Sequence, residues 1–474
     1  MTVRGVSTLR TILSSLGWLF LAEVAGRALT LLAIVHLTHR LGPESMGIVE
    51  LGLNLFAFLT LVSLGGVEIL ATRQASHGLR GLGRLSTSQI VVAWVWMLPA
   101  GALVVALLVS SGHDATTTVV AGGLAASALL SPLALRFAFL GQEQMDAVAL
   151  GSLLGQVIWV ACVLSFVHGP EEVHRIPLLW LAGEAARVSL MLALFGRRFG
   201  RPEPSPARLV CAQLKASVPL SVGRVARGLI YFVDVLVLSL CAPLQVVGLY
   251  AVGLRLPLFL VGLTTLANRS LFPSFTRATR AGGPEASTEL LSTVLPLVLS
   301  LSIAAACSLA VSGEAFLTML FGDVYGQAAL WMAILLCRAP AAAISGLYRM
   351  VLWSEAPGRE AKNAVIAIAT CLAALFILTP LFGPTGAALA MVLGEAVLAL
   401  LYARATRDLI GPVRLSHGWR WRQGAVLLPL AGWAYWVQEQ GVWTTILSAV
   451  VVGGLCGVAP LLPQLPDLYR ALRR

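Results

Sequence analysis

Long runs of apolar residues, each about one membrane thickness in length, follow one another along almost the whole chain. They are continuous, whereas the strands of a membrane β-barrel alternate between apolar and polar positions. We therefore predict an all-α polytopic membrane protein with about fourteen transmembrane helices joined by short loops. The expected spans are 15–38, 47–70, 88–111, 117–138, 147–168, 176–196, 217–241, 247–271, 289–311, 328–353, 362–382, 384–404, 423–438 and 442–463.

Composition agrees with this pattern and excludes several other classes. Of the 474 residues, 58% are hydrophobic and only 12% charged, against ~25% charged in a typical soluble domain. The net charge of +11 resides mainly in short loops, which argues against a nucleic-acid partner. Nearly all basic loop residues fall on one side if the N-terminus is cytoplasmic. With an even number of spans, both termini are then cytoplasmic, in a bacterial inner membrane.

A repeated motif predicts two similar halves. The pattern G-x4-G-L-x-L occurs at 47–55 and again at 248–256, and Arg27 and Arg227 precede the two copies at nearly the same distance. Six predicted spans separate the copies, so both halves enter the membrane from the same side, as in a parallel repeat. The expected domains are a six-helix lobe at 1–196, a cytoplasmic linker at 197–216, a second six-helix lobe at 217–404, and a basic loop with two extra spans and a tail at 405–474.

Charged residues inside the predicted spans are the candidates for function, because charges in the membrane are costly. On a continuous helix over 217–241, Arg224, Arg227, Tyr231 and Asp234 would share one sector about 80° wide. Such a cationic stripe predicts a water-filled interior that receives an anionic group. Further candidates for this interior are Arg27, Arg255, Thr30, Glu184, Arg187 and Arg338.

Two carboxylates lie one helical turn from an arginine, and their interpretation stays open. Glu23 with Arg27, and Glu184 with Arg187, either form local ion pairs that only neutralise charge or line the cavity. Glu23, Asp234 and Glu395 are the candidates for coupling transport to a proton or sodium gradient.

Catalytic and cofactor motifs are absent from the sequence. The chain has no glycine-rich phosphate loop, no H-E-x-x-H and no G-x-S-x-G. Its seven cysteines are scattered without metal-binding spacing. We expect no catalytic residues, no metal and no cofactor, and therefore a transporter and not an enzyme.

Several short segments resemble a known family. Leu41-Gly-Pro-Glu-Ser-Met-Gly47 is similar to the loop after the first span of polysaccharide-biosynthesis flippases of the Wzx (O-antigen translocase) type, although Met46 stands where that family usually has an aromatic residue. The other similar segments are 233–234 with 248–255, 271–273, 321–325 and 382–389. The family belongs to one superfamily with multidrug-and-toxin exporters and lipid II flippases.

The resemblance implies a two-lobe carrier that works by alternating access. Its expected cargo is an undecaprenyl-diphosphate-linked oligosaccharide, a repeat unit of O-antigen or exopolysaccharide, which moves from the cytoplasmic to the outer leaflet. Arg224, Arg227, Arg27 and Arg255 would hold the diphosphate. Expected partners are the substrate, the bilayer, and a polysaccharide polymerase with its chain-length machinery. The alternatives are a cation-coupled multidrug or metabolite antiporter of the same fold, a lipid II flippase, and a membrane polymerase or ligase.

Overall fold

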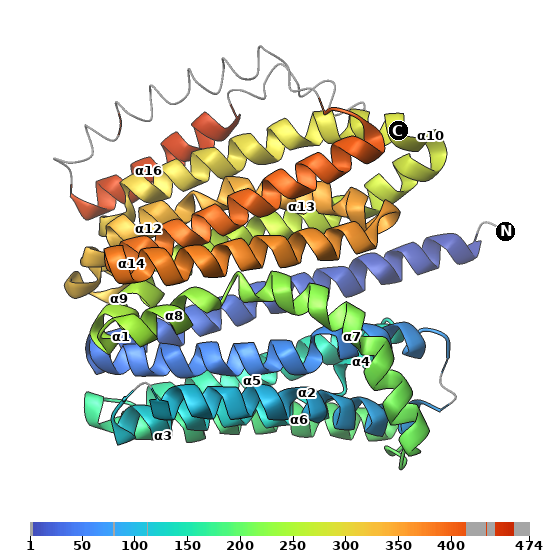
Figure 1. Ribbon diagram of the computed structural model, residues 1–474, viewed down its shortest axis with the longest axis horizontal. Coiled ribbons are helices and arrows are strands. Elements are labelled where there is room, and N and C mark those ends of the chain that lie inside the picture. Colours follow the sequence, from blue (N-terminus) through green and yellow to red (C-terminus); the bar gives the residue numbers. More distant parts are fainter. Residues whose placement is uncertain (1–2, 79–80, 111, 414–432, 434–440, 459–474) are drawn as a thin grey trace. The chain divides into compact units, whose positions relative to one another are not determined.

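The computed structural model describes residues 3–78, 81–110, 112–413, 433 and 441–458. The chain forms two compact units, Met1–Phe232 and Val233–Arg474. Each is built from α-helices and short 3-10 turns, with no strand among the described residues (Figure 1). The all-α prediction is therefore confirmed.

The N-terminal unit is organised around α1, which contacts α2, α3, α5 and α7. α1 consists of two helical arms joined at Gly42, and its neighbours pack along these arms (Figure 1). The elements of this unit are α1 Val3–Ala75, α2 Leu82–Ser110, α3 Ala115–Ala126, η1 Ser127–Ala134, α4 Arg136–Gly141, α5 Met145–Phe166, η2 Pro170–Arg175, α6 Ile176–Phe199 and α7 Ala207–Leu229.

The C-terminal unit has α10, α13 and α14 as its main body, with α8 packed on α14 and α16 packed on α10. Its elements are α8 Val233–Cys241, α9 Leu244–Gly253, α10 Arg255–Val311, α11 Gly313–Phe321, η3 Asp323–Ala328, α12 Ala329–Leu336, α13 Arg338–Glu355, α14 Pro357–Ile410 and α16 Val442–Val458.

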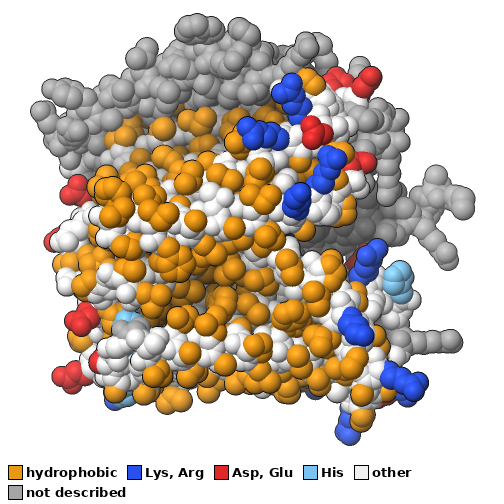
Figure 2. Space-filling model, in the orientation of Figure 1, with side chains coloured by type: hydrophobic (Ala, Val, Ile, Leu, Met, Phe, Trp, Pro, Cys, Tyr) orange, Lys and Arg blue, Asp and Glu red, His pale blue; other side chains and the backbone are white. Residues whose placement is uncertain are grey.

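Nine helices of the described part of the chain are long and apolar enough to cross a membrane. Figure 2 shows hydrophobic side chains over the middle of the visible helices, while Lys and Arg side chains gather toward one end of each unit's visible face. This is a multi-pass membrane protein. The predicted number of fourteen spans stays a prediction, because 423–438 lies outside the described residues except for Trp433, and α16 is described only to Val458.

Among the described residues, three pairs of predicted spans are each joined by a sharp corner within one long helix. α1 turns at Gly42, α10 at Gly283 and α14 at Gly383, with φ values of 75°, 65° and 57°. Left-handed φ values favour glycine because it lacks a Cβ. A proline follows each of these glycines in the sequence, and its fixed φ suits the first turn of a helix. The Gly-Pro pair thus ends one span and begins the next.

The predicted continuous helix over 217–241 is wrong. α7 ends at Leu229 and α8 begins at Val233, and between them the backbone makes tight turns, with the amide of Tyr231 donating to the carbonyl of Gly228 at 3.0 Å. The four residues of the predicted stripe therefore do not lie on one helix. The compact units divide at Phe232, and the cytoplasmic linker at 197–216 stays a prediction.

Close packing explains why α7 belongs with the N-terminal unit. α7 lies against α1, where a methyl group added at Gly66 would overlap Ser221 and one added at Gly228 would overlap Leu61. Glycine at these positions lets the two backbones approach closely, as is common between membrane helices.

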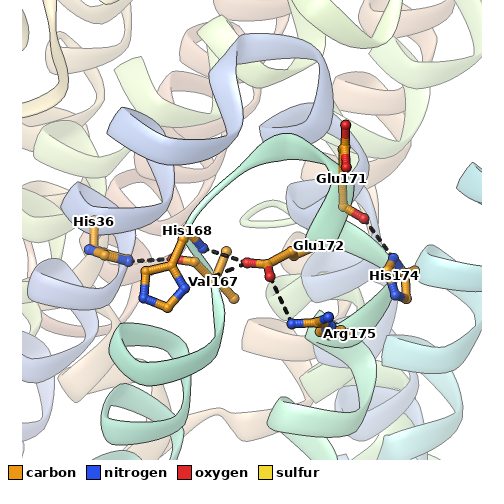
Figure 3. A network of polar contacts seen from close by, with 7 residues as sticks. All are labelled: His36, Val167, His168, Glu171, Glu172, His174 and Arg175. Carbon is orange, nitrogen blue, oxygen red and sulfur yellow. Dashed lines mark hydrogen bonds and ion pairs between the residues drawn. The ribbon is translucent and has the colours of Figure 1, made fainter.

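A polar network fixes the connection between α5 and α6 (Figure 3). The backbone amide of His168 donates to Glu172 Oε2 at 2.6 Å, and Arg175 Nη1 donates to Glu172 Oε1 at 2.7 Å. His36 of α1 joins the network, since its Nε2 lies 2.8 Å from the carbonyl oxygen of Val167. His36 is half-buried, so it packs against this connection.

Candidate functional site

The N-terminal unit contains a partly open cavity of about 240 Å³, lined mainly by α1, α5 and α6. It lies entirely within this unit. Its lining combines aromatic rings, hydroxyl groups, an amide and charged side chains: Phe56, Thr60, Leu64, Ser131, Arg136, Ser152, Gly155, Gln156, Trp159, Trp180, Gly183, Glu184 and Arg187.

Three aromatic side chains form one side of this cavity. The rings of Phe56 and Trp180 meet edge to face, with centroids 5.2 Å apart, and those of Trp159 and Trp180 do the same at 5.1 Å. Edge-to-face contact is a favoured geometry for aromatic pairs. The three rings thus hold one another in place on three different stretches of helix, which makes the aromatic side a fixed surface.

Charged side chains occupy the same cavity as ion pairs. Arg187 Nη2 pairs with Glu184 Oε2, and each side chain keeps 14% of its surface exposed. Arg136 Nε lies 3.8 Å from Glu68 Oε1. From their spacing, Glu184 and Arg187 were expected either to form a local ion pair or to line the cavity. In the structure they form an ion pair that lines the cavity.

Glycines bring α5 and α6 together behind this ion pair. A methyl group added at Gly183 would lie 2.8 Å from the carbonyl oxygen of Gly155, and one added at Gly155 would lie 3.0 Å from Cβ of Arg187. Gly151 and Gly155 form a G-x-x-x-G sequence, which favours close helix contact in membranes. The backbone approach therefore sets where the Arg187 side chain emerges.

Several N–H groups facing this environment lack a partner. Arg136 Nε, Arg187 Nε and Trp180 Nε1 are buried and have no hydrogen-bond partner among the described residues. A buried donor without an acceptor costs about 1–3 kcal/mol. Three such donors around one cavity indicate that an acceptor-rich molecule, water or a ligand, fills it.

The polar stripe predicted for the first span reaches this cavity. The hydroxyl of Thr30 lies 3.1 Å from Oε1 of Gln156, which is part of the lining. Arg27, one turn before Thr30, is exposed. Glu23, the expected partner of Arg27, lies outside the side chains that the structure describes.

The arginines of α7 are placed differently from the cavity residues. Arg224 is exposed, with its aliphatic stem over Gly65 of α1, and Arg227 is half-buried in the last turn of α7. A cation in the last turn of a helix is favoured by the helix dipole. Tyr231, in the turn that follows, is half-buried. Arg227 thus sits at the interrupted end of α7, and Arg224 lies one turn before it.

The remaining candidates belong to the C-terminal unit. Asp234 of α8 is 0% exposed and accepts a hydrogen bond of 3.0 Å from the hydroxyl of Tyr250. Glu395 of α14 is 1% exposed and accepts one of 3.0 Å from Ser345.

One buried cation serves both of these carboxylates. Arg338, the first residue of α13, is 1% exposed, and its charge acts on both Asp234 and Glu395. Arg255, in contrast, is half-buried at the start of α10. The structure therefore brings three of the predicted residues into one sealed cluster.

Sequence reasoning did not single out the aromatic and amide residues of the cavity. The signal was present, because Ser152, Gln156 and Trp159 recur at i, i+4 and i+7 on α5 and therefore share one face. Trp180 lies one turn before Glu184 on α6. A helix face that combines tryptophan, glutamine and serine within an apolar run therefore indicates a polar cavity.

Comparison with known proteins places the chain in a family. Residues 12–279, more than half of the chain, match the family described as polysaccharide biosynthesis protein. The chain belongs to this family, as the sequence motifs predicted. A curated relative is the probable low-salt glycan biosynthesis flippase Agl15 of Haloferax volcanii, with 22% identity over 81% of each chain.

Solved structures confirm the fold. The lipid II flippase MurJ in an inward closed conformation is similar over 96% of this chain and 99% of its own, with a TM-score of 0.75 and 13% identity. An inward-facing multidrug resistance MATE transporter of the MOP superfamily is similar over 81% of this chain and 94% of its own, with a TM-score of 0.60 and 15% identity. The predicted MOP-type fold is therefore correct.

Proposed function

We propose that this protein is a flippase for a lipid-linked oligosaccharide. It carries an undecaprenyl-diphosphate-linked repeat unit of a surface polysaccharide from the cytoplasmic to the outer leaflet of a bacterial inner membrane, by alternating access. Family membership and the similarity to the archaeal relative, a probable glycan biosynthesis flippase, support this class of cargo.

The observation that carries the proposal is the placement of Arg224 and Arg227 at the interrupted end of α7. A diphosphate cannot cross hydrocarbon without partners, and arginine binds phosphate oxygens with paired, charge-assisted hydrogen bonds. Two guanidinium groups one turn apart suit such a group. In this proposal Arg27 and Arg255 are further diphosphate ligands, and the polyprenyl tail stays in the lipid.

The finer assignments follow from the same proposal. Both termini lie in the cytoplasm, on the side with the basic loops. A proton or sodium gradient drives the cycle through Glu23, Asp234 or Glu395. A polymerase and its chain-length machinery receive the exported unit on the outer side.

The test is the double variant Arg224→Ala with Arg227→Ala, expressed in a strain that lacks the native gene. We expect surface glycan to be lost and lipid-linked oligosaccharide to accumulate on the cytoplasmic side. Arg84→Ala is the matched control, because Arg84 is an exposed residue that pairs with Glu203 at 3.2 Å, and such surface pairs contribute little. Normal glycan export by the double variant, at wild-type protein levels in the membrane, would contradict the proposal.

The same strains separate the alternatives. A lipid II flippase would be required for growth, whereas loss of a surface-glycan flippase removes the glycan and leaves cells viable. A drug antiporter would confer resistance when overexpressed, without a glycan defect on deletion. Chain elongation in vitro by the purified protein would point to a polymerase.

A further inference from the structure

We propose that the cavity of the N-terminal unit is a sugar subsite, which binds one uncharged sugar ring of the transported glycan. This inference rests on the proposed function for its cargo. Its physical basis is separate, because it lies in the lining of a cavity that does not include Arg224 or Arg227.

The size of the cavity limits the ligand. Its volume of about 240 Å³ is below the ~300–1,000 Å³ typical of pockets for drug-sized molecules. A single sugar ring is the part of a lipid-linked oligosaccharide that suits such a space. The cavity is partly open, so a glycan chain can continue outside it.

The charge balance of the lining selects an uncharged ligand. Arg187 is paired with Glu184, and Arg136 with Glu68, so the two cations are each neutralised. A diphosphate would meet no net positive charge here, and Glu184 would repel it. A molecule with many hydroxyl groups and no charge fits a lining of this kind.

The polar atoms of the lining match both functions of a hydroxyl group. Arg187 Nε and Trp180 Nε1 are donors without a protein acceptor among the described residues, and sugar oxygens would accept from them. The carboxylate oxygens of Glu184 and the amide oxygen of Gln156 can accept hydrogen bonds from sugar hydroxyls. The lining thus offers both donors and acceptors to a sugar, which it needs in order to replace the hydrogen bonds of the water that the sugar displaces.

Aromatic rings complete the site. The C–H bonds of a sugar ring carry partial positive charge, and the faces of aromatic rings are partially negative. Phe56, Trp159 and Trp180 all line the cavity and contact one another edge to face. A lining of hydrogen-bonding groups with aromatic rings favours a sugar over an entirely polar ion or an entirely apolar tail.

Binding is tested directly on the purified full-length protein in detergent. Saturation-transfer NMR with methyl glycosides of glucose, galactose, mannose and N-acetylglucosamine detects weak sugar binding. We expect at least one glycoside to bind at millimolar concentration. Trp180→Phe keeps a ring but loses the donor, and Arg187→Lys keeps the charge but loses Nε–H. Each should weaken binding about tenfold, the effect of one charge-assisted or buried hydrogen bond.

A matched control separates the cavity from other tryptophans. Trp94 of α2 lies outside the lining, and its Nε1 already donates to the carbonyl oxygen of Leu129 at 3.1 Å. Trp94→Phe should leave glycoside binding unchanged. If no glycoside binds, or if Trp94→Phe weakens binding as much as Trp180→Phe, the cavity holds water only and the subsite is wrong.

Export measurements keep this inference distinct from the proposed function. If deletion of the gene abolishes surface glycan while Trp180→Phe with Arg187→Lys binds and exports normally, the flippase stands and the subsite falls. If glycosides bind in a Trp180-dependent way but deletion leaves every surface glycan intact, the site is a sugar site and the proposed cargo is wrong.

Discussion

The two units place charged residues inside the membrane region in different ways. In the N-terminal unit, Glu184 and Arg187 each keep 14% of their side-chain surface exposed and line a cavity. In the C-terminal unit, Asp234, Arg338 and Glu395 are at most 1% exposed and lie among packed helices. The first arrangement leaves room for a sugar-sized molecule, and the second is closed to a molecule of that size. The paired charges of the N-terminal unit thus have space for a ligand beside them, whereas the charges of the C-terminal cluster are packed against protein.

Energetics give the two arrangements different meanings. Removing one partner from a buried charged group costs about 3–5 kcal/mol, whereas exposed pairs are worth about 0–1 kcal/mol. The C-terminal cluster contains two carboxylates and one guanidinium, all sealed. Loss of any one of these charges should therefore destabilise the packing of α8, α13 and α14 strongly. The Glu184–Arg187 pair of the N-terminal unit is partly exposed, so it can exchange its partner for a ligand at a smaller cost in free energy.

The largest expected effect follows from Arg338→Leu. Loss of this cation leaves two sealed carboxylates without their main counter-ion, so we expect destabilisation of about 3–5 kcal/mol, seen as a large fall in Tm and in yield of folded protein in detergent. Adding Asp234→Asn and Glu395→Gln to the same chain should restore much of the loss. The control is Arg349→Lys, since Arg349 is half-buried, 4.7 Å from the ring of Trp353. A Tm for Arg338→Leu within the range of that control would contradict a sealed cluster.

Tyr250→Phe comes next. It removes the hydroxyl that donates to Asp234 at 3.0 Å and leaves that carboxylate with one fewer donor. Hydrogen bonds to charged groups contribute about 1.5–3 kcal/mol, so we expect a loss of that size in thermal or denaturant unfolding. Tyr231→Phe is the control, because Tyr231 is half-buried in the turn after α7. An equal loss of stability in the two variants would mean that the Tyr250–Asp234 hydrogen bond is no more shielded from water than the turn that contains Tyr231.

The contrast between the units was only partly predictable from the sequence. The helices and their corners could be predicted, because an apolar run or a Gly-Pro pair such as 42–43 determines the structure of its own segment. The break at 230–232 could not, since neither proline nor glycine stands there. It depends on α7 packing against α1 in one unit while α8 packs on α14 in the other.

The candidate sites show the same limit. The Glu184–Arg187 pair could be predicted from its spacing within one helix. The cavity around it depends on how Gly155 and Gly183 set the approach of α5 to α6, and that contact joins residues on two helices. Nor could the pattern along α8 reveal that Asp234 faces a buried arginine from α13.

Gly183→Ala tests whether this glycine contact positions the cavity. The added methyl group would lie 2.8 Å from the carbonyl oxygen of Gly155, so the two backbones must separate. Overpacking of this kind costs about 1–3 kcal/mol, and glycoside binding should weaken because Arg187 and Trp180 lie on the same helix. Gly122→Ala on α3 is the control, since its methyl group would meet only Leu108 Cδ1 at 4.0 Å. Gly183→Ala with unchanged Tm and binding would show that the cavity does not depend on this contact.

The smallest effect is expected for a charge that is neither in a cavity nor sealed. Asp114 is exposed and caps the N-terminus of α3, and the hydrogen bond from the Thr117 hydroxyl lowers its pKa below 3.8. A carboxylate with a depressed pKa stabilises the folded state above its unfolded pKa, and this contribution is lost as the pH falls through the folded value. Asp114→Ala should therefore cost about 1 kcal/mol at pH 7, and the Tm difference from wild type should persist at pH 5 and shrink only below 3.8. Asp114→Asn, which keeps a capping oxygen, should stay close to wild type at pH 7. If Asp114→Ala lowers the Tm as much as Arg338→Leu does, the comparison of cavity, sealed and exposed charges is wrong, because an exposed capping residue would then stabilise the fold as much as a sealed charge.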